Sequence, residues 1–246
     1  MTTPVVVTAF RLETRAVLAA LAQVERIRPA TRPCWRGRAG TGEVVVVEGR
    51  VGPDGARAAV AALPPETALV VSAGFAGALA PELAPGDVIL ASEVVWEEGS
   101  RVRRHATAPP VLDALSRALT DALGGEPRIG VVLSSPVVVA GVAGKRAAFD
   151  RHAALAVEME AAVLAEAAES RGVPFVALRI VLDPADLSLE ALPPNLESSW
   201  VARARLATTP TAWPLLGTLR RHAATAATEL TRTMRAALPV LVGDRG

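Results

Sequence analysis

Short apolar stretches typical of buried β-strands alternate along the chain with amphipathic stretches of helical period, and this alternation most constrains the fold. Strands separated by helices of about 10 to 15 residues favour a largely parallel sheet with helices on both faces. The expected strands cover residues 5–9, 43–48, 68–72, 87–95, 128–134, 155–158 and 175–182. The expected helices cover residues 13–23, 55–63, 110–123, 145–151, 159–170 and 215–238.

The length of the chain allows one large domain. With 246 residues, of which 51% are hydrophobic, the chain can bury a full core. Because no repeat, low-complexity tract or linker divides the sequence, we expect a single domain over residues 1–246. The proline-rich segment 187–214 is predicted to form either a lid over the site or a surface excursion with a short helix. The helix at 215–238 would follow it.

Composition excludes several classes of function. The 26 basic and 25 acidic residues nearly balance, so nothing in the charge indicates nucleic acid as a partner. Cys34 is the only cysteine, which rules out an internal disulfide and a zinc cluster. The chain has no signal-peptide pattern and no apolar run long enough for a membrane span, so a cytoplasmic location is expected. We expect no metal and no cofactor. Lys145 is the only lysine, and the excess of arginine is interpreted as compositional bias.

Carboxylates follow three of the expected strands. Glu13 comes after the first strand, Glu160 after the strand 155–158, and Asp183 ends the last strand directly before a proline. Open α/β sheets bind ligands at the carboxyl ends of their strands, where these three side chains could converge. Three acids around one pocket suit general acid–base chemistry. The alternative is structural: a glutamate complements a helix dipole, and an Asp-Pro pair is common in turns.

Three motifs in register resemble the nucleoside phosphorylase/nucleosidase superfamily. They are the glycine-rich Val70–Leu79 with the following Leu83–Val88, the VEME of 157–160, and Arg179 with Asp183 four residues later. The resemblance runs from Val5 to about Asp186, roughly three quarters of the chain. It implies a three-layer α/β/α fold with a central mixed, largely parallel sheet. It also implies cleavage of a ribosyl N-glycosidic bond by a homo-oligomer, expected to be a homodimer.

The resemblance implies a role for each acid. Glu13 corresponds to the acid that activates the attacking water, and Glu160 to the one that binds the ribose hydroxyls, with Met159 packing on the sugar. Asp183 corresponds to the acid that protonates the departing purine. These roles suit the chemistry, because the ribosyl centre becomes cationic and the purine leaves poorly as an anion. Arg179 would orient a catalytic group or form a structural salt bridge. Further substrate contacts are implied for Gly74, Phe75, Ala76, Val137, Val138 and Glu158.

The chain departs from the family pattern at three places. Phe75 replaces a small polar residue that helps to hold phosphate in the phosphorylases, which favours hydrolysis, with inorganic phosphate left open as a co-substrate. Leu182 replaces the serine before the aspartate. Pro136-Val137 replaces a base-stacking phenylalanine, so aliphatic and backbone groups of Ser135–Val138 would clamp the base.

Within the superfamily, Phe75, Pro136-Val137 and the DPAD of 183–186 most resemble hopanoid-associated enzymes, which release adenine from adenosylhopane. The expected substrate is therefore an adenine nucleoside with a bulky apolar 5′ substituent. Peripheral membrane contact through the basic C-terminal helix is one expectation. The other is that this helix packs its apolar stripe on the sheet. Two functional alternatives stay open: a methylthioadenosine/adenosylhomocysteine or futalosine nucleosidase, and a nucleoside-binding protein without catalysis.

Overall fold

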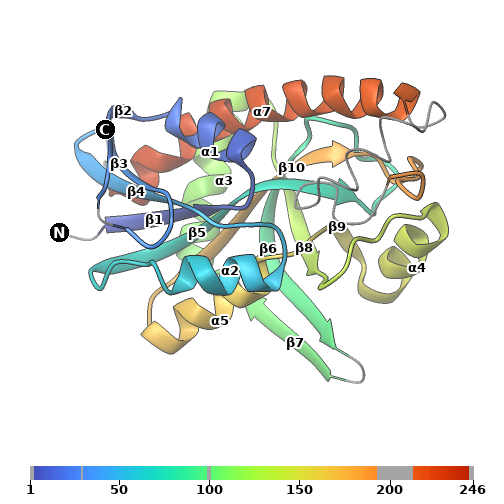
Figure 1. The fold of residues 1–246 in the computed structure, drawn as a ribbon, viewed down its shortest axis with the longest axis horizontal. Helices are drawn as coiled ribbons and strands as arrows, with labels where there is room; N and C mark the ends of the chain where they lie inside the picture. The colour runs from blue at the N-terminus through green and yellow to red at the C-terminus, as the bar shows by residue number, and fades with distance from the viewer. Residues whose placement is uncertain (1–2, 29, 99–100, 193–212, 244–246) are drawn as a thin grey trace.

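The computed structural model describes residues 3–28, 30–98, 101–192 and 213–243. Within them, one ten-stranded mixed sheet lies between two layers of helices (Figure 1). The strands are β1 (Thr3–Thr8), β2 (Ala22–Arg26), β3 (Cys34–Ala39), β4 (Gly42–Glu48), β5 (Thr67–Ala78), β6 (Val88–Glu98), β7 (Arg101–Ala106), β8 (Arg128–Ser134), β9 (Ala154–Glu158) and β10 (Phe175–Asp183). The helices are α1 (Arg11–Leu18), α2 (Pro53–Val60), α3 (Pro109–Leu123), α4 (Val142–His152), α5 (Ala161–Arg171) and α7 (Trp213–Leu241). The structure confirms the expected mixed α/β/α architecture.

Four parallel strands bring their carboxyl ends to one edge of the sheet. β1 pairs in parallel with both β4 and β5, and β5 pairs in parallel with β10. β10 then pairs with β6, β6 with β8, β8 with β9, and β9 with the end of β5. The strands β5, β10, β6, β8 and β9 therefore close into a ring, and β1, β4, β3 and β2 extend from it.

Alternating side chains of the central strands fill two cores. Val5 and Val7 of β1 pack in the core beneath α2 and α5, whereas Val6 packs in the core beneath α1, α3 and α7. Strand β4 divides its valines in the same way. Because both faces of these strands are buried, they read in the sequence as continuous apolar runs rather than as alternating ones.

The prediction of a helix over 13–23 is wrong in its second half. α1 ends at Leu18, and residues 22–26 form the strand β2, which the sequence did not indicate. All five residues of β2 are exposed, so the strand has no apolar face to detect, and its pairing with β3 holds it at the edge of the sheet. Gln23 has a φ of 51°, within an irregular register between β2 and β3. The strands β3 and β7 were also not predicted.

The prediction of a short strand over only 68–72 is also wrong. β5 continues to Ala78, and its ladder with β10 pairs Gly74 with Arg179 and Gly77 with Asp183. Glycine is normally weak in strands, but β10 pairs with both glycines, and β9 also pairs with Gly77. The long β5 therefore carries the glycine-rich motif along the edge where the predicted acids lie.

The C-terminal helix α7 packs its apolar stripe against the sheet. Leu230, Met234 and Leu238 are fully buried in the core shared with α1 and α3. Among the described residues, no helix combines the length and apolar character that a membrane span needs. The predicted lid at 187–214 falls mostly on residues 193–212, outside the described ranges, and is not tested.

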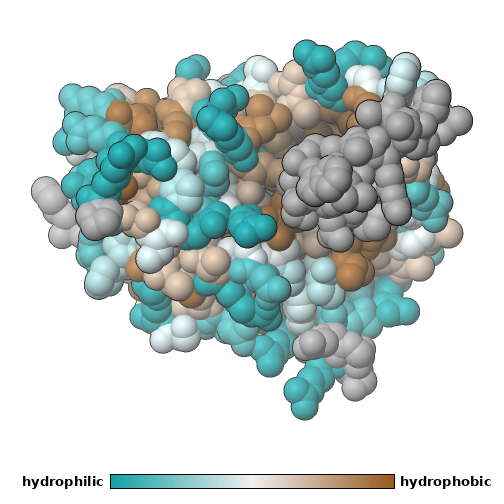
Figure 2. All heavy atoms as spheres, viewed as in Figure 1, coloured by the Kyte–Doolittle hydropathy of each residue, from teal (hydrophilic) through white to brown (hydrophobic). Residues whose placement is uncertain are grey.

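Strands β6 and β7 form a hairpin that projects from the body of the molecule (Figure 1). Arg101, Arg103 and Arg104 of β7 are exposed, and hydrophilic side chains cover the hairpin at the foot of Figure 2. Arg103 forms an ion pair with Glu166 of α5, which ties the hairpin to the helix layer. The hairpin therefore presents a charged surface at some distance from the sheet edge described above.

Candidate active site

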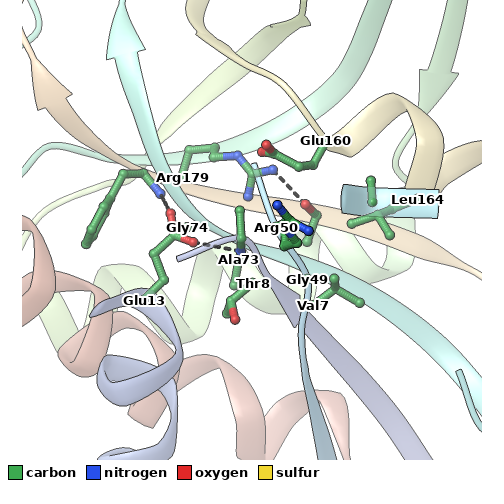
Figure 3. Close-up of a pocket in the computed structure, with 14 residues that line it drawn as sticks. Val7, Thr8, Glu13, Gly49, Arg50, Ala73, Gly74, Glu160, Leu164 and Arg179 are labelled. Carbon is green, nitrogen blue, oxygen red and sulfur yellow. Dashed lines mark hydrogen bonds between the residues drawn. The ribbon is translucent and has the colours of Figure 1, made fainter. Parts of the chain in front are cut away.

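A pocket opens at the carboxyl ends of β1 and β4, beside the middle of β5 and β10 (Figure 3). Its empty space, counted with the open solvent at its mouth, is about 270 Å³, and its walls come from these strands and from α1, α2 and α5. Three charged side chains predicted from the sequence to matter line it: Glu13, Glu160 and Arg179. Arg50, at the end of β4, adds an exposed cation at the wall. The fold thus gathers charged groups that are far apart in the sequence.

Glu13 lies in the first turn of α1 and turns back into the pocket. Its Oε2 accepts hydrogen bonds from the backbone N–H groups of Ala9 and Phe10, both at 2.9 Å, and its Oε1 accepts one from Phe75 at 2.7 Å. The side chain is only 2% exposed. Burial raises the pKa of Glu13 above its ordinary value of 4.5, against the opposing effect of the three N–H groups. A carboxylate with a raised pKa accepts a proton more readily near neutral pH.

Gly74 is required by the position of the Glu13 carboxylate. A Cβ atom at residue 74 would lie 2.4 Å from Oε1 of Glu13 and 2.7 Å from its Cδ. Only glycine lets β5 pass this close to the acid while the next residue, Phe75, donates its N–H to it. The glycine-rich motif therefore makes room for a carboxylate of the same chain.

Glu160 lies on the other wall of the pocket, at the N-terminal cap of α5. Its Oε1 accepts a hydrogen bond of 2.6 Å from the N–H of Gly52, which has a φ of 85° and starts α2. Burial raises the pKa of Glu160 to about 8, and the negative charge of Glu158 adds to the effect. Met159 comes close to the same glycine, since a Cβ at residue 52 would lie 3.8 Å from its Cε.

Arg179 and Glu158 form a buried ion pair behind the pocket. Nη2 of Arg179 lies 2.5 Å from Oε2 of Glu158 and 2.6 Å from Oγ of Ser72. The same Oε2 accepts the N–H groups of Glu160 and Ala161, so Glu158 caps α5. Glu158 was predicted to contact substrate, but it does not line this pocket. It fixes Arg179 and the start of the helix that carries Glu160.

Asp183 lies apart from the pocket lining, at the end of β10. It is 4% exposed, and its Oδ2 lies 2.5 Å from Nζ of Lys145, a residue of α4 that is itself 1% exposed. The sequence interpretation missed Lys145 because its singularity was attributed to composition. The signal in the sequence was that Lys145 is the only lysine in a chain that otherwise uses arginine. The structure shows that this position holds a buried ammonium group.

Some of the remaining predicted site residues line the pocket and others do not. Gly74 and Phe75 line the pocket, whereas Ala76 is buried in the core beneath α2 and α5. Val137 and Val138 are 65% and 61% exposed and do not line it. Within the described ranges, no group of three or more acidic, histidine or cysteine side chains could hold a metal ion.

Comparison with known proteins adds sequence relatives. The chain is 30% identical over 136 residues to a 5′-methylthioadenosine/S-adenosylhomocysteine nucleosidase of Baumannia cicadellinicola, covering 49% of this chain and 58% of the relative. It is 33% identical over 132 residues to a futalosine hydrolase of Streptomyces coelicolor, covering 47% and 54%. The chain thus spans little more than half the length of these relatives.

Solved structures match over nearly the whole chain. An S-adenosylhomocysteine nucleosidase from Streptococcus pyogenes, in complex with 5-methylthiotubericidin, aligns with a TM-score of 0.72 at 20% identity, covering 95% of this chain and 96% of that one. A futalosine hydrolase of Helicobacter pylori aligns with a TM-score of 0.71 at 20% identity, covering 94% and 97%. At this identity the likeness shows the fold.

A family model identifies the family to which the chain belongs. It matches residues 3–208, which hold the pocket, the glycine-rich strand and all three predicted acids. The chain belongs to the phosphorylase superfamily.

Proposed function

We propose that this chain is a nucleosidase that hydrolyses the N-glycosidic bond of a purine nucleoside, of the methylthioadenosine/adenosylhomocysteine or futalosine type. The names of the two sequence relatives support this substrate class. The observation that carries the proposal is the Glu13 carboxylate, buried in the pocket with a raised pKa. A base in this position can take a proton from an attacking water.

The backbone donors around Glu13 favour water over phosphate as the nucleophile. The N–H groups of Ala9, Phe10 and Phe75 are directed at the two oxygens of one carboxylate and would suit an anion. The Glu13 carboxylate already occupies all three. A phosphate would have to displace it or lie beside its negative charge, whereas a neutral water meets neither obstacle.

The proposed reaction uses the acids in turn. The water oxygen bonds to C1′ of the ribose while its proton passes to Glu13, and the C1′–N9 bond breaks with its electron pair going to the base. Glu160, partly exposed in the pocket, would in its ionised form accept hydrogen bonds from the ribose hydroxyls and stabilise the positive charge at C1′. Asp183 would give the base its proton. It lies four residues beyond Arg179, about 13 Å along β10.

The adenosylhopane substrate stays a prediction from the sequence, as do dimerisation and lipid contact. The two relatives by sequence act, by their names, on nucleosides of other kinds. We therefore rank the small-substituent nucleosides first. Adenosylhopane, a nucleoside with a 5′ hydrocarbon substituent, is included among the substrates to be tested.

The test is base release from 5′-methylthioadenosine, S-adenosylhomocysteine, futalosine and adenosylhopane, each with and without inorganic phosphate. We expect the free base and free sugar from at least one of the first three, at a rate that does not depend on phosphate. A rate that requires phosphate, with ribose 1-phosphate as product, would overturn hydrolysis. Calorimetric binding of these nucleosides without turnover would favour the nucleoside-binding alternative.

A further inference from the structure

Lys145 is a buried residue whose ammonium group is fully hydrogen-bonded. It lies on α4 and is 1% exposed, and its Nζ contacts three acceptors: Oδ2 of Asp183 at 2.5 Å, the carbonyl of Pro184 at 2.8 Å and the carbonyl of Leu187 at 3.0 Å. An ammonium has three N–H groups, so each of them has a partner. The lysine is therefore held as a cation with a fixed orientation.

The three acceptors all belong to the end of β10 and the turn that follows it. Two of them are carbonyls, which accept hydrogen bonds and carry no net charge, so Asp183 alone supplies the opposite charge. A buried cation without such a partner would be strongly unfavourable. Lys145 thus links α4 to the strand end and fixes both the turn and one oxygen of the aspartate.

The other oxygen of Asp183 is left for a ligand. Within the parts of the chain that the structure describes, the hydrogen bond to this carboxylate goes to Oδ2, and Oδ1 has none. Gly77 of β5 provides the space, because a Cβ there would lie 3.0 Å from Oδ2 and 3.2 Å from Oδ1. The carboxylate therefore lies close over the backbone of β5, with one oxygen anchored and one unbonded.

We propose that Lys145 is a positioning residue for Asp183, an inference that rests on the proposed nucleosidase function. Its ammonium anchors Oδ2, so that Oδ1 is the oxygen that faces the leaving base. When the Oδ1–H bond breaks and the proton passes to the base nitrogen, the carboxylate that remains is stabilised by the adjacent ammonium. Solvent returns the proton to Asp183 after the base has left. Lys145 itself gains and loses no proton.

The test compares two substrates that differ in their need for a proton. A purine leaves poorly as an anion, whereas 4-nitrophenolate leaves readily without protonation. The variants are Lys145→Met and, as a matched control, Arg146→Met, whose side chain is 66% exposed on the same helix. For 5′-methylthioadenosine, or whichever nucleoside the wild type cleaves best, we expect Lys145→Met to lower kcat at least about tenfold with little change in KM. For 4-nitrophenyl β-D-ribofuranoside we expect less than a threefold change, and Arg146→Met should match the wild type on both substrates.

The ratio of the two rates does not depend on how much of the variant protein is folded. An unchanged ratio in Lys145→Met, with both substrates slowed alike, would overturn the inference while the wild-type turnover still supports the nucleosidase. If the wild type releases no base from any nucleoside, the proposed function itself fails.

A second measurement does not need the synthetic riboside. If Lys145 acts through Asp183, then Lys145→Met should cost less than about threefold in nucleoside kcat when Asp183→Asn is already present. Losses that multiply in the double variant would contradict the inference. Lys145→Arg, which keeps the charge, should recover part of the rate that Lys145→Met loses.

Discussion

Four carboxylates gather near the same sheet edge, and the structure holds them in two different ways. Glu13 and Glu160, in the pocket, are bound by backbone N–H groups. Glu158 and Asp183, outside its lining, are paired with the buried cations Arg179 and Lys145. Neutral N–H donors compensate only part of the free-energy cost of burying a charged carboxylate. The pKa values of both pocket acids are therefore raised. A buried cation beside the acid fixes the position of its carboxylate.

The two kinds of contact therefore give these acids different roles. The acids held by amides have raised pKa values and can exchange a proton near neutral pH, whereas the ion pair of Glu158 with Arg179 orients its neighbours. The ion pair of Glu158 and Arg179 sets the start of α5, which carries Glu160. Variants that change one kind of contact at a time separate the two roles.

The largest effect is expected from removing a cation. Arg179→Met leaves Glu158 as a buried charge without its partner, and we expect the free energy of unfolding in urea to fall by about 3–5 kcal/mol. Arg117→Met, at an exposed position of α3, is the control and should change it by less than about 0.5 kcal/mol. Equal losses for the two variants would show that Glu158 does not depend on Arg179.

The second largest effect is expected at Glu13, the proposed general base, which is held by backbone N–H groups. Glu13→Gln keeps the shape of the side chain but removes the carboxylate that would take a proton from water. We expect kcat for nucleoside hydrolysis to fall at least about 100-fold, the range for a general base. Glu25→Gln, on the exposed strand β2, should leave kcat unchanged. Wild-type kcat in Glu13→Gln would remove Glu13 from the mechanism.

A smaller effect is expected from crowding the same carboxylate. Gly74→Ala would place a Cβ 2.4 Å from Oε1 of Glu13, so one of the two must move. We expect the free energy of unfolding to fall by about 2 kcal/mol. Gly125→Ala, where a new Cβ meets nothing within 4 Å, provides the matched control. A Gly74→Ala protein as stable as this control would mean that Glu13 lies elsewhere.

The smallest effect, taken per unit of pH, concerns the titration of Glu160. The pKa of Glu160 is about 8 in the folded protein against an ordinary 4.5, so the folded state holds this proton more tightly than the unfolded chain. Its contribution to stability is complete below about pH 4.5 and is lost as the pH rises toward 8, by up to about 1.4 kcal/mol per pH unit. Subtracting the urea-unfolding curve of Glu160→Gln from that of the wild type at pH 5, 6, 7 and 8 should reveal this slope. Parallel curves would mean that Glu160 is ionised in the empty pocket.

The sequence was most informative where burial is complete. The strand 128–134 was predicted with the bounds that the structure has, and the apolar runs of β1 and β10 were placed within a residue or two. The edge strand β2 could not be found, because an exposed strand that is held by pairing alone has no apolar pattern. The passage of β5 through Gly74 depends on partner strands, which local propensity does not describe.

The site was predictable in its residues but not in its connections. Motif resemblance pointed to Glu13, Glu160, Arg179 and Asp183, and the first three line one pocket. The contact between Lys145 and Asp183 joins residues 38 positions apart. Neither periodicity nor motif spacing could pair them, because the contact depends on how α4 lies against the end of β10.

The ring of strands described above leaves β10 hydrogen-bonded on both sides, to β5 and to β6. A slip of one residue would break both ladders and turn Arg179 and Asp183 to the opposite face of the sheet. This strand therefore tolerates little evolutionary drift. We expect lineages of this fold to acquire new substrates by changing exposed loop positions outside β10, while Arg179 and Asp183 of this strand stay the same.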